Sequence, residues 1–134
     1  MKKYIILSII VLFATASMIF TSCDNEEDPT TGNTSVSLVP MSGESVDVSG
    51  MTVELHYTAT YDDLYMQLYS VGYAASASVE MQDILPGTYY LVAWTDNDGS
   101  SDFSTGDYFG FHPGAINIAA GDELAYTIEV YVVD

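Results

Sequence analysis

The sequence predicts an all-β fold, a single antiparallel β-sandwich of about seven to eight strands, over residues 36–134. Two observations predict it. Apolar and polar residues alternate with a period of two in several segments, and turn-forming dipeptides separate these segments. A sandwich follows because strands with one apolar face must bury that face against other strands.

The predicted strands follow one another in the chain with short turns between them. The clearest lies at 51–61, where every second residue is apolar: Met51, Val53, Leu55, Tyr57, Ala59 and Tyr61. The same alternation is present at 77–81 and 124–132. Shorter strands are predicted at Val36–Val39, Val46–Val48, Leu64–Val71, Tyr108–Phe111 and Ala115–Ile118.

Residues 85–96 carry a family resemblance. A Pro-Gly turn is followed by alternating tyrosine, leucine and small apolar residues, and this segment resembles the strand entry of prealbumin-like and carboxypeptidase-regulatory-like sandwich domains. The resemblance implies a prealbumin-like or Ig-like sandwich. It also implies that the core receives Tyr89, Leu91 and Ala93. The alternate residues then face outward or lie under a loop: Tyr90, Val92 and Trp94.

The chain begins with the features of an export signal. Two lysines precede an apolar segment at 4–20, and small residues then lead to Cys23, the one cysteine of the chain. Residues 19–23 resemble the lipobox of bacterial lipoproteins, which implies cleavage before Cys23 and lipid attachment to its thiol. The predicted parts are a signal peptide at 1–22, a lipidated and flexible linker at 23–35, and the domain at 36–134. The alternatives are plain secretion and an uncleaved membrane helix.

Cleavage before Cys23 would leave a chain with all 19 acidic residues and without lysine or arginine. Such a chain has no side chain that could neutralise phosphates, which excludes a basic nucleic-acid interface. The acidic run at 24–28 resembles the export signal of Bacteroides-type surface lipoproteins. That resemblance implies an outer-membrane lipoprotein exposed on the cell surface and held to the membrane by lipid. A rule known from enteric bacteria implies inner-membrane retention instead.

The segment 96–107 has the oxygen spacing of a calcium loop. The predicted ligands stand at positions 1, 3, 5, 7 and 12 of the loop: Asp96, Asp98, Ser100, Asp102 and Asp107. Ser104 offers a further oxygen at position 9. The loop differs from an EF-hand because Ser101 replaces the glycine at position 6 and an aspartate replaces the final glutamate. The alternative is a solvated acidic turn without metal.

Aromatic residues form the second candidate site. The predicted strand faces place Tyr65 with Tyr69, and Tyr90 with Trp94, and these four side chains are candidates for binding a glycan or a protein ligand. The alternative is that they are half-buried strand residues, which tyrosine often is.

Catalysis has little support in the sequence, and we expect no enzyme. The two histidines lie far apart, and we expect His56, on the polar face of its strand, to be a solvated residue and not a base. His112 lies in a turn, and we find no hydrolase, zinc or phosphate-binding motif. The sequence therefore predicts a lipid-anchored accessory of the cell envelope that binds a surface ligand. The alternative is a structural component of an outer-membrane complex with no ligand of its own.

Overall fold

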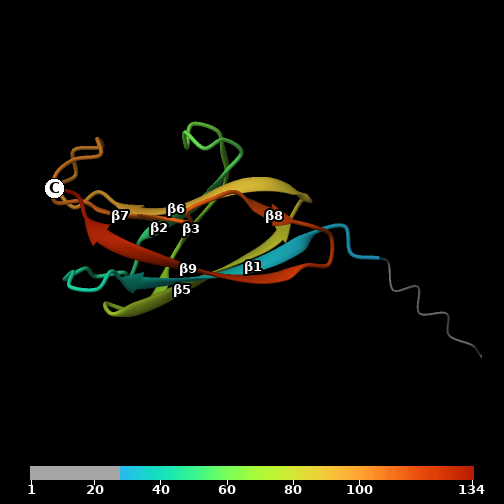
Figure 1. Cartoon of the computed structure of the whole chain (residues 1–134), viewed down its shortest axis with the longest axis horizontal. Helices are drawn as coiled ribbons and strands as arrows, with labels where there is room; N and C mark the ends of the chain where they lie inside the picture. The colour runs from blue at the N-terminus through green and yellow to red at the C-terminus, as the bar shows by residue number, and fades with distance from the viewer. Residues whose placement is uncertain (1–27) are drawn as a thin grey trace, which may run out of the picture.

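A computed structural model describes residues 28–134 as an all-β domain (Figure 1). The predicted signal peptide, Cys23 and most of the acidic run lie outside the described residues. Within the described part of the chain, no helix is long and apolar enough to cross a membrane. The strands are β1 (Gly32–Pro40), β2 (Thr52–His56), β3 (Leu64–Tyr69), β4 (Val71–Tyr73), β5 (Ser76–Ile84), β6 (Gly87–Thr95), β7 (Tyr108–Phe111), β8 (Ile116–Ile118) and β9 (Glu123–Val132).

The strands form one hydrogen-bonded path in the order β3-β2-β6-β7-β9-β1-β5-β4, with β8 paired to β6. The two ends of this path, β3 and β4, follow each other in the chain with only Ser70 between them. The sheet therefore nearly closes on itself. In Figure 1, β1, β5 and β9 lie across from β2, β3, β6 and β7.

The prediction of a wholly antiparallel sheet is wrong at one pair of strands. β1 and β9 run parallel over eight paired positions, from Asn33 with Glu123 to Pro40 with Val130. These are the first and last strands of the chain, so no short turn forces them to run in opposite directions. All the other strand pairs within residues 28–134 are antiparallel.

The core lies between the two parts of the sheet, and the alternation in the sequence locates most of it. Tyr89, Leu91 and Ala93 are buried, as the family resemblance implied. The alternation predicted in β5 and β9 is confirmed by the buried residues Ala77, Val79, Met81, Ile128 and Val130. β1 also buries Val36 and Leu38. Burial of this apolar surface is the main term that stabilises the fold.

Three predicted boundaries differ from the structure. β1 begins at Gly32, four residues before the predicted domain boundary, and pairs there with Ile84 of β5. β2 ends at His56, and the predicted continuation to Tyr61 is a loop in which Tyr61 has a φ of 55°. The predicted strand at Val46–Val48 is an irregular segment whose valines are nevertheless buried, and the Val48 amide bonds Ala74 O at 3.0 Å.

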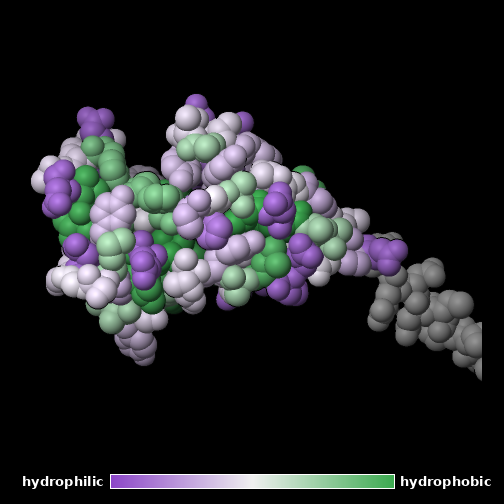
Figure 2. Space-filling model, viewed as in Figure 1, coloured by the Kyte–Doolittle hydropathy of each residue, from purple (hydrophilic) through white to green (hydrophobic). Residues whose placement is uncertain are grey.

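Apolar residues also reach the surface, most of all at the two strands that end the sheet. Figure 2 shows hydrophobic and hydrophilic residues interspersed on one face of the molecule. Val71 and Tyr73 of β4 are 78% and 85% exposed, and Tyr69 at the end of β3 is 62% exposed. The free edge of β4 is therefore both apolar and accessible.

Candidate functional site

The outer face of β2, β6 and β7 carries a group of side chains that point away from the core. Strand pairing places Glu54 of β2 opposite Val92 of β6, and Trp94 of β6 opposite Phe109 of β7. Their neighbours in the chain, such as Leu55 and Ala93, are fully buried on the opposite face. Since side chains alternate along a strand, the outer set lies together on one surface.

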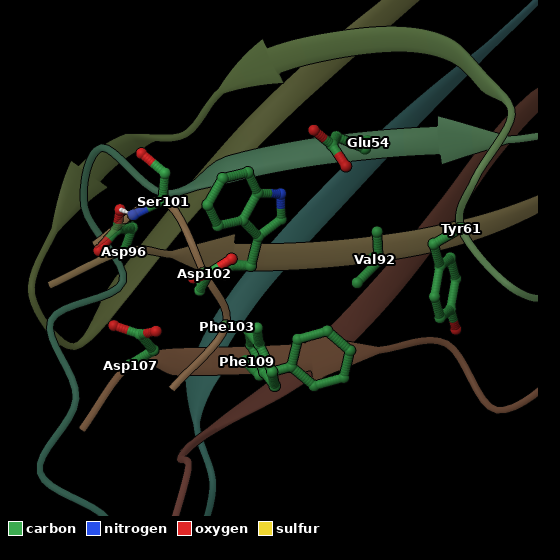
Figure 3. Close-up of a pocket in the computed structure, with 10 residues that line it drawn as sticks. Glu54, Tyr61, Val92, Asp96, Ser101, Asp102, Phe103, Asp107 and Phe109 are labelled. Atoms are coloured by element: carbon green, nitrogen blue, oxygen red, sulfur yellow. Dashed lines mark hydrogen bonds between the residues drawn. The ribbon is translucent and has the colours of Figure 1, made fainter. Parts of the chain in front are cut away.

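The loop at 96–107 folds over part of this surface and forms one wall of an open cavity of about 290 Å³. Figure 3 shows the loop residues Asp102 and Phe103 near Phe109, with Glu54 and Tyr61 at the other side. The cavity is lined by Glu54, Tyr61, Val92, Trp94, Asp96, Ser101, Asp102, Phe103, Asp107 and Phe109. It therefore combines aromatic walls with carboxylates.

Three aspartates hold the loop in shape through backbone amides, and the simplest of these bonds runs from Ser100 N to Asp98 Oδ1 at 2.8 Å. Asp96 Oδ1 accepts from Gly99 N at 2.7 Å, and Asp96 Oδ2 accepts from Ser101 N at 2.8 Å. Asp107 is 1% exposed, and its two oxygens accept from Asn97 N and Ser104 N, each at 2.8 Å. Asp107 thus ties the two ends of the loop together.

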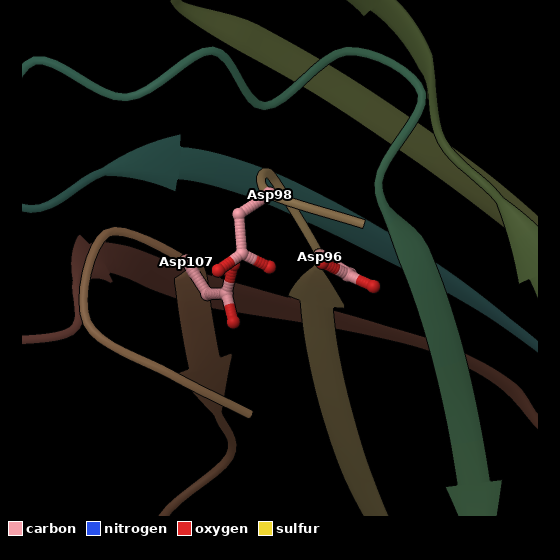
Figure 4. A group of neighbouring side chains, drawn as sticks. All are labelled: Asp96, Asp98 and Asp107. Carbon is pink, nitrogen blue, oxygen red and sulfur yellow. The ribbon is translucent and has the colours of Figure 1, made fainter. Parts of the chain in front are cut away.

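Of the four aspartates predicted as calcium ligands, three come together and one does not. The carboxylates of Asp96, Asp98 and Asp107 each place an oxygen within 4.8 Å of the others (Figure 4). The fourth, Asp102, lines the cavity. The Ser100 hydroxyl donates to Asp102 O at 2.9 Å, and a side-chain hydrogen bond with Ser100 lowers the pKa of Asp98, so Ser100 lies beside the three carboxylates. The Ser104 hydroxyl lies 3.2 Å from Asp98 Oδ2, close to the three carboxylates.

The three carboxylates can share one hard cation on geometric grounds. Calcium takes oxygen ligands at about 2.3–2.6 Å, so two of its ligand oxygens lie at most about 5 Å apart. Each carboxylate oxygen has two lone pairs, so the amide bonds to Asp96 and Asp107 leave acceptor capacity. Three carboxylates are fewer than the six to eight oxygens of a complete calcium shell, so carbonyls or water would supply the rest.

The prediction that His56 is a solvated residue is wrong. His56 is 4% exposed, and its Nε2 lies 2.8 Å from Glu54 Oε2. The loop after β2 covers it, with the Tyr61 ring edge-on at 5.6 Å between centroids. Hydrogen bonds from the hydroxyls of Thr58 and Thr60 to Asp62 fix this loop and lower the pKa of Asp62. His56 Nδ1 is buried without a hydrogen-bond partner among the described residues.

The four predicted ligand-binding aromatics do not form one site. Trp94 lines the cavity, while Tyr90 lies opposite His56 on the same outer face and does not reach the cavity. The predicted shared face of Tyr65 and Tyr69 is wrong because an irregularity in β3 changes the register between Leu55 and His56.

Tyr65 consequently belongs to the edge of the core, whereas Tyr69 remains exposed. The Tyr65 ring lies 4.9 Å from that of Tyr89, and its hydroxyl accepts from Leu85 N at 2.9 Å. Tyr65 is therefore a structural residue and does not line the cavity.

Sequence reasoning missed several residues of the cavity, among them Glu54, Tyr61 and Phe103. Glu54 was on the polar face of its predicted strand, where solvent was the simplest environment. The signal that could have found it is the apolar outer face of its neighbour, with Val92 and Trp94, because an apolar outer face requires a cover.

Comparisons with known proteins give no relative from which a function could be inferred. No protein-family model matches the chain, and neither the curated proteins nor the solved structures contain a match.

Proposed function

We propose that this chain is a non-catalytic binding module, held to the cell envelope by lipid on Cys23, with its ligand site in the cavity under the loop at 96–107. The observation that carries the proposal is the cavity itself. It places the one tryptophan of the chain, Trp94, beside Phe103 and Phe109 and among four carboxylates. Ligand sites are typically concave and apolar with a few placed polar groups.

The cavity suits a glycan or a protruding side chain of a protein. Aromatic rings stack on the C–H faces of sugars, and carboxylates accept hydrogen bonds from hydroxyl groups. A volume of about 290 Å³ is at the low end of the range for small-molecule sites. We therefore expect it to hold one sugar ring or one side chain of a larger ligand on the cell surface.

Calcium is part of the proposal as a stabiliser of the loop. The cation would lie among Asp96, Asp98 and Asp107, where three negative charges repel one another without it. Asp96 and Asp107 also line the cavity. A bound cation would thus fix the loop that carries Phe103, and would fix one wall of the ligand site.

We further propose that the domain is a prealbumin-like sandwich on an outer-membrane surface lipoprotein. Support for the sandwich comes from a core that lies between two parts of the sheet and from the inward Tyr89, two residues after the Pro-Gly turn.

Support for the localisation at the outer membrane comes from the lipobox-like segment that ends at Cys23 and from the acidic run after it. Cys23→Ala should release the protein from membranes, and proteinase added to intact cells should digest the wild type. Full protection of the wild type would contradict surface exposure.

An array of glycans and peptides tests the binding function. We expect reproducible hits for the wild type that are lost in Trp94→Leu, a variant that keeps an apolar side chain on the strand. Tyr73→Ser on β4 is the matched control because it removes an exposed aromatic residue far from the cavity lining. The absence of hits, or hits that survive Trp94→Leu, would contradict the proposed site.

The second candidate function is a structural component of an outer-membrane complex, and the edge of β4 favours it. Val71 and Tyr73 are largely exposed on a strand that pairs on one side with β5. An exposed, apolar strand edge is a place where another chain can add a strand. Co-purification of a stoichiometric partner that is lost in Val71→Lys would support this role over ligand binding.

A further inference from the structure

The cavity under the loop at 96–107 is rich in both carboxylates and aromatic rings. Four of its lining residues are acidic, Glu54, Asp96, Asp102 and Asp107, and four are aromatic, Tyr61, Trp94, Phe103 and Phe109. Residues 28–134 contain no lysine or arginine, so the described part of the chain cannot supply a side-chain ammonium or guanidinium group to these carboxylates.

Two of the four carboxylates are occupied by the loop, and the other two are open to a ligand. Asp96 and Asp107 accept hydrogen bonds from backbone amides. Glu54 has one partner among the described residues, His56 at its Oε2, and the Asp102 carboxylate has none. Glu54 is also 9% exposed, which places its charge where water screens it weakly.

The aromatic rings of the cavity favour a cationic ligand, as its carboxylates do. The face of an aromatic ring attracts a cation, most strongly for tryptophan, and the attraction increases when water is excluded. Phe103 and Phe109 pack edge-to-face at 4.8 Å between ring centroids, and Phe109 lies opposite Trp94 across the strand pair. A cation in this cavity would therefore meet aromatic walls and two open carboxylates.

We propose, on the basis of the binding function proposed above, that the cavity takes a protonated amine at the end of a short alkyl chain. The alkyl part packs on the rings, while the N–H donors of the ammonium bond the Glu54 carboxylate, and Asp102 adds a second negative charge to the same cavity. The volume of about 290 Å³ corresponds to roughly ten water molecules at about 30 Å³ each, which is room for a lysine-sized chain.

Trp94 fluorescence tests this directly, because Trp94 is the one tryptophan of the chain and lines the cavity. The probes are Nα-acetyl-lysine N-methylamide, its norleucine analogue, which has an alkyl chain and no amine, and n-butylammonium. We expect a saturable change with the lysine probe and a response to the norleucine analogue weaker by on the order of tenfold or more. A stronger response to the lysine probe than to n-butylammonium would assign the amine to a protein partner, and the reverse order would assign it to a small molecule.

Variants locate the amine. Glu54→Gln keeps the shape of the side chain and should weaken binding of the lysine probe on the order of tenfold. Glu80→Gln is the matched control, since it removes one exposed charge from β5, outside the cavity lining, and should leave binding unchanged. All titrations are run in saturating calcium and repeated in excess EDTA, so that the state of the three aspartates is the same within each series, and a melting curve of each variant verifies its fold.

Three results would overturn the inference. These are equal binding of the lysine and norleucine probes, no change with either amine, or a response of folded Glu54→Gln equal to the wild type. The array distinguishes failure of this inference from failure of the binding function. Array ligands that depend on Trp94 but carry no amine would overturn the preference for an amine and retain the cavity as the ligand site. No array hit and no response to any amine probe would overturn both proposals.

Discussion

Glu54 and His56, two residues apart on β2, form a hydrogen bond of 2.8 Å beneath a loop, on the face of the strand that the sequence marks as polar. The pair lies beside the cavity, since Glu54 lines it and Tyr61 packs on His56. Polar groups that lose contact with water need partners, so each of these two side chains depends on the other. The outer face of β2 is therefore buried at Glu54 and His56, although it lies on the side of the strand opposite the core.

The first prediction concerns the coupling of this pair. Glu54→Ala and His56→Ala should each lower the free energy of unfolding by about 1–3 kcal/mol, since each leaves a buried polar partner unsatisfied. The double variant should cost less than the two single changes together, with a coupling of about 1 kcal/mol or more. Urea denaturation of the four proteins measures it.

An exposed pair provides the control for that cycle. Asn33 Nδ2 donates to Glu123 Oε1 at 2.7 Å, but this bond is open to solvent. The same cycle on Asn33 and Glu123 should give a coupling below about 0.5 kcal/mol. Equal coupling in the two pairs would contradict the account of Glu54 and His56 as a covered pair.

The second prediction concerns calcium. The metal should raise the melting temperature of the wild type, and excess EDTA should reverse the rise, because a ligand that binds only the folded state stabilises it by about 2.7 kcal/mol at a concentration one hundred times its Kd. Asp98→Asn should abolish most of the effect, since it removes one of the three close carboxylates. Glu80→Gln should retain it. A melting temperature indifferent to EDTA would show that the loop is an acidic turn held by its own amides.

The third prediction concerns alkaline pH. Burial of Tyr89, with Tyr65 and Tyr57 beside it, raises its pKa from 10.0 to about 12. The folded state therefore favours the neutral phenol, and this contribution is complete below pH 10 and is lost as the pH rises toward about 12.

Tyr89→Phe removes this titration and also the bond of 2.6 Å from the hydroxyl to Leu85 O. The variant should lose less free energy of unfolding across that pH window than the wild type, by on the order of 2 kcal/mol. Tyr73→Phe, at an exposed position, should behave like the wild type. Parallel pH profiles for Tyr89→Phe and the wild type would contradict the burial of the hydroxyl.

The fourth prediction concerns the approach of β7 to β9. A Cβ on Gly110 would lie 2.6 Å from both Glu129 O and Ile128 Cγ2, so Gly110→Ala should destabilise the fold by about 1–3 kcal/mol. Gly114→Ala is matched, because a Cβ there meets nothing within 4 Å. Chemical denaturation compares them, and equal stability of the two variants would contradict this strand packing.

The sequence predicts the inward faces better than the outer ones. Period-two alternation locates Val53, Val79 and Ile128 in the core because the core side of a strand has a single environment. It fails for His56, whose environment depends on the loop that folds over it, and for Tyr65, whose face depends on an irregular pairing with β2. In both cases the side chain contacts a segment whose position cannot be predicted from the local sequence pattern.

The prediction for the acidic loop at 96–107 also agrees with the structure only in part. The predicted spacing brings Asp96, Asp98 and Asp107 together, but it assumes one centre for all of the oxygens. Asp102 departs from that centre, since it lines the cavity, while its backbone O accepts a hydrogen bond from the Ser100 hydroxyl. The turn chemistry of serine and aspartate competes with any regular ligand spacing.

Mapping the bound ligand on the protein is the most direct test of the central claim, that the cavity is the ligand site. Amide and indole NMR signals of residues 28–134 would be followed during titration with the strongest array ligand. We expect the largest shifts at the Trp94 indole and at the amides of Ser101, Asp102 and Phe103, with β4 unchanged. Shifts centred on Val71 and Tyr73, with the Trp94 indole unmoved, would contradict the claim and place recognition at the strand edge.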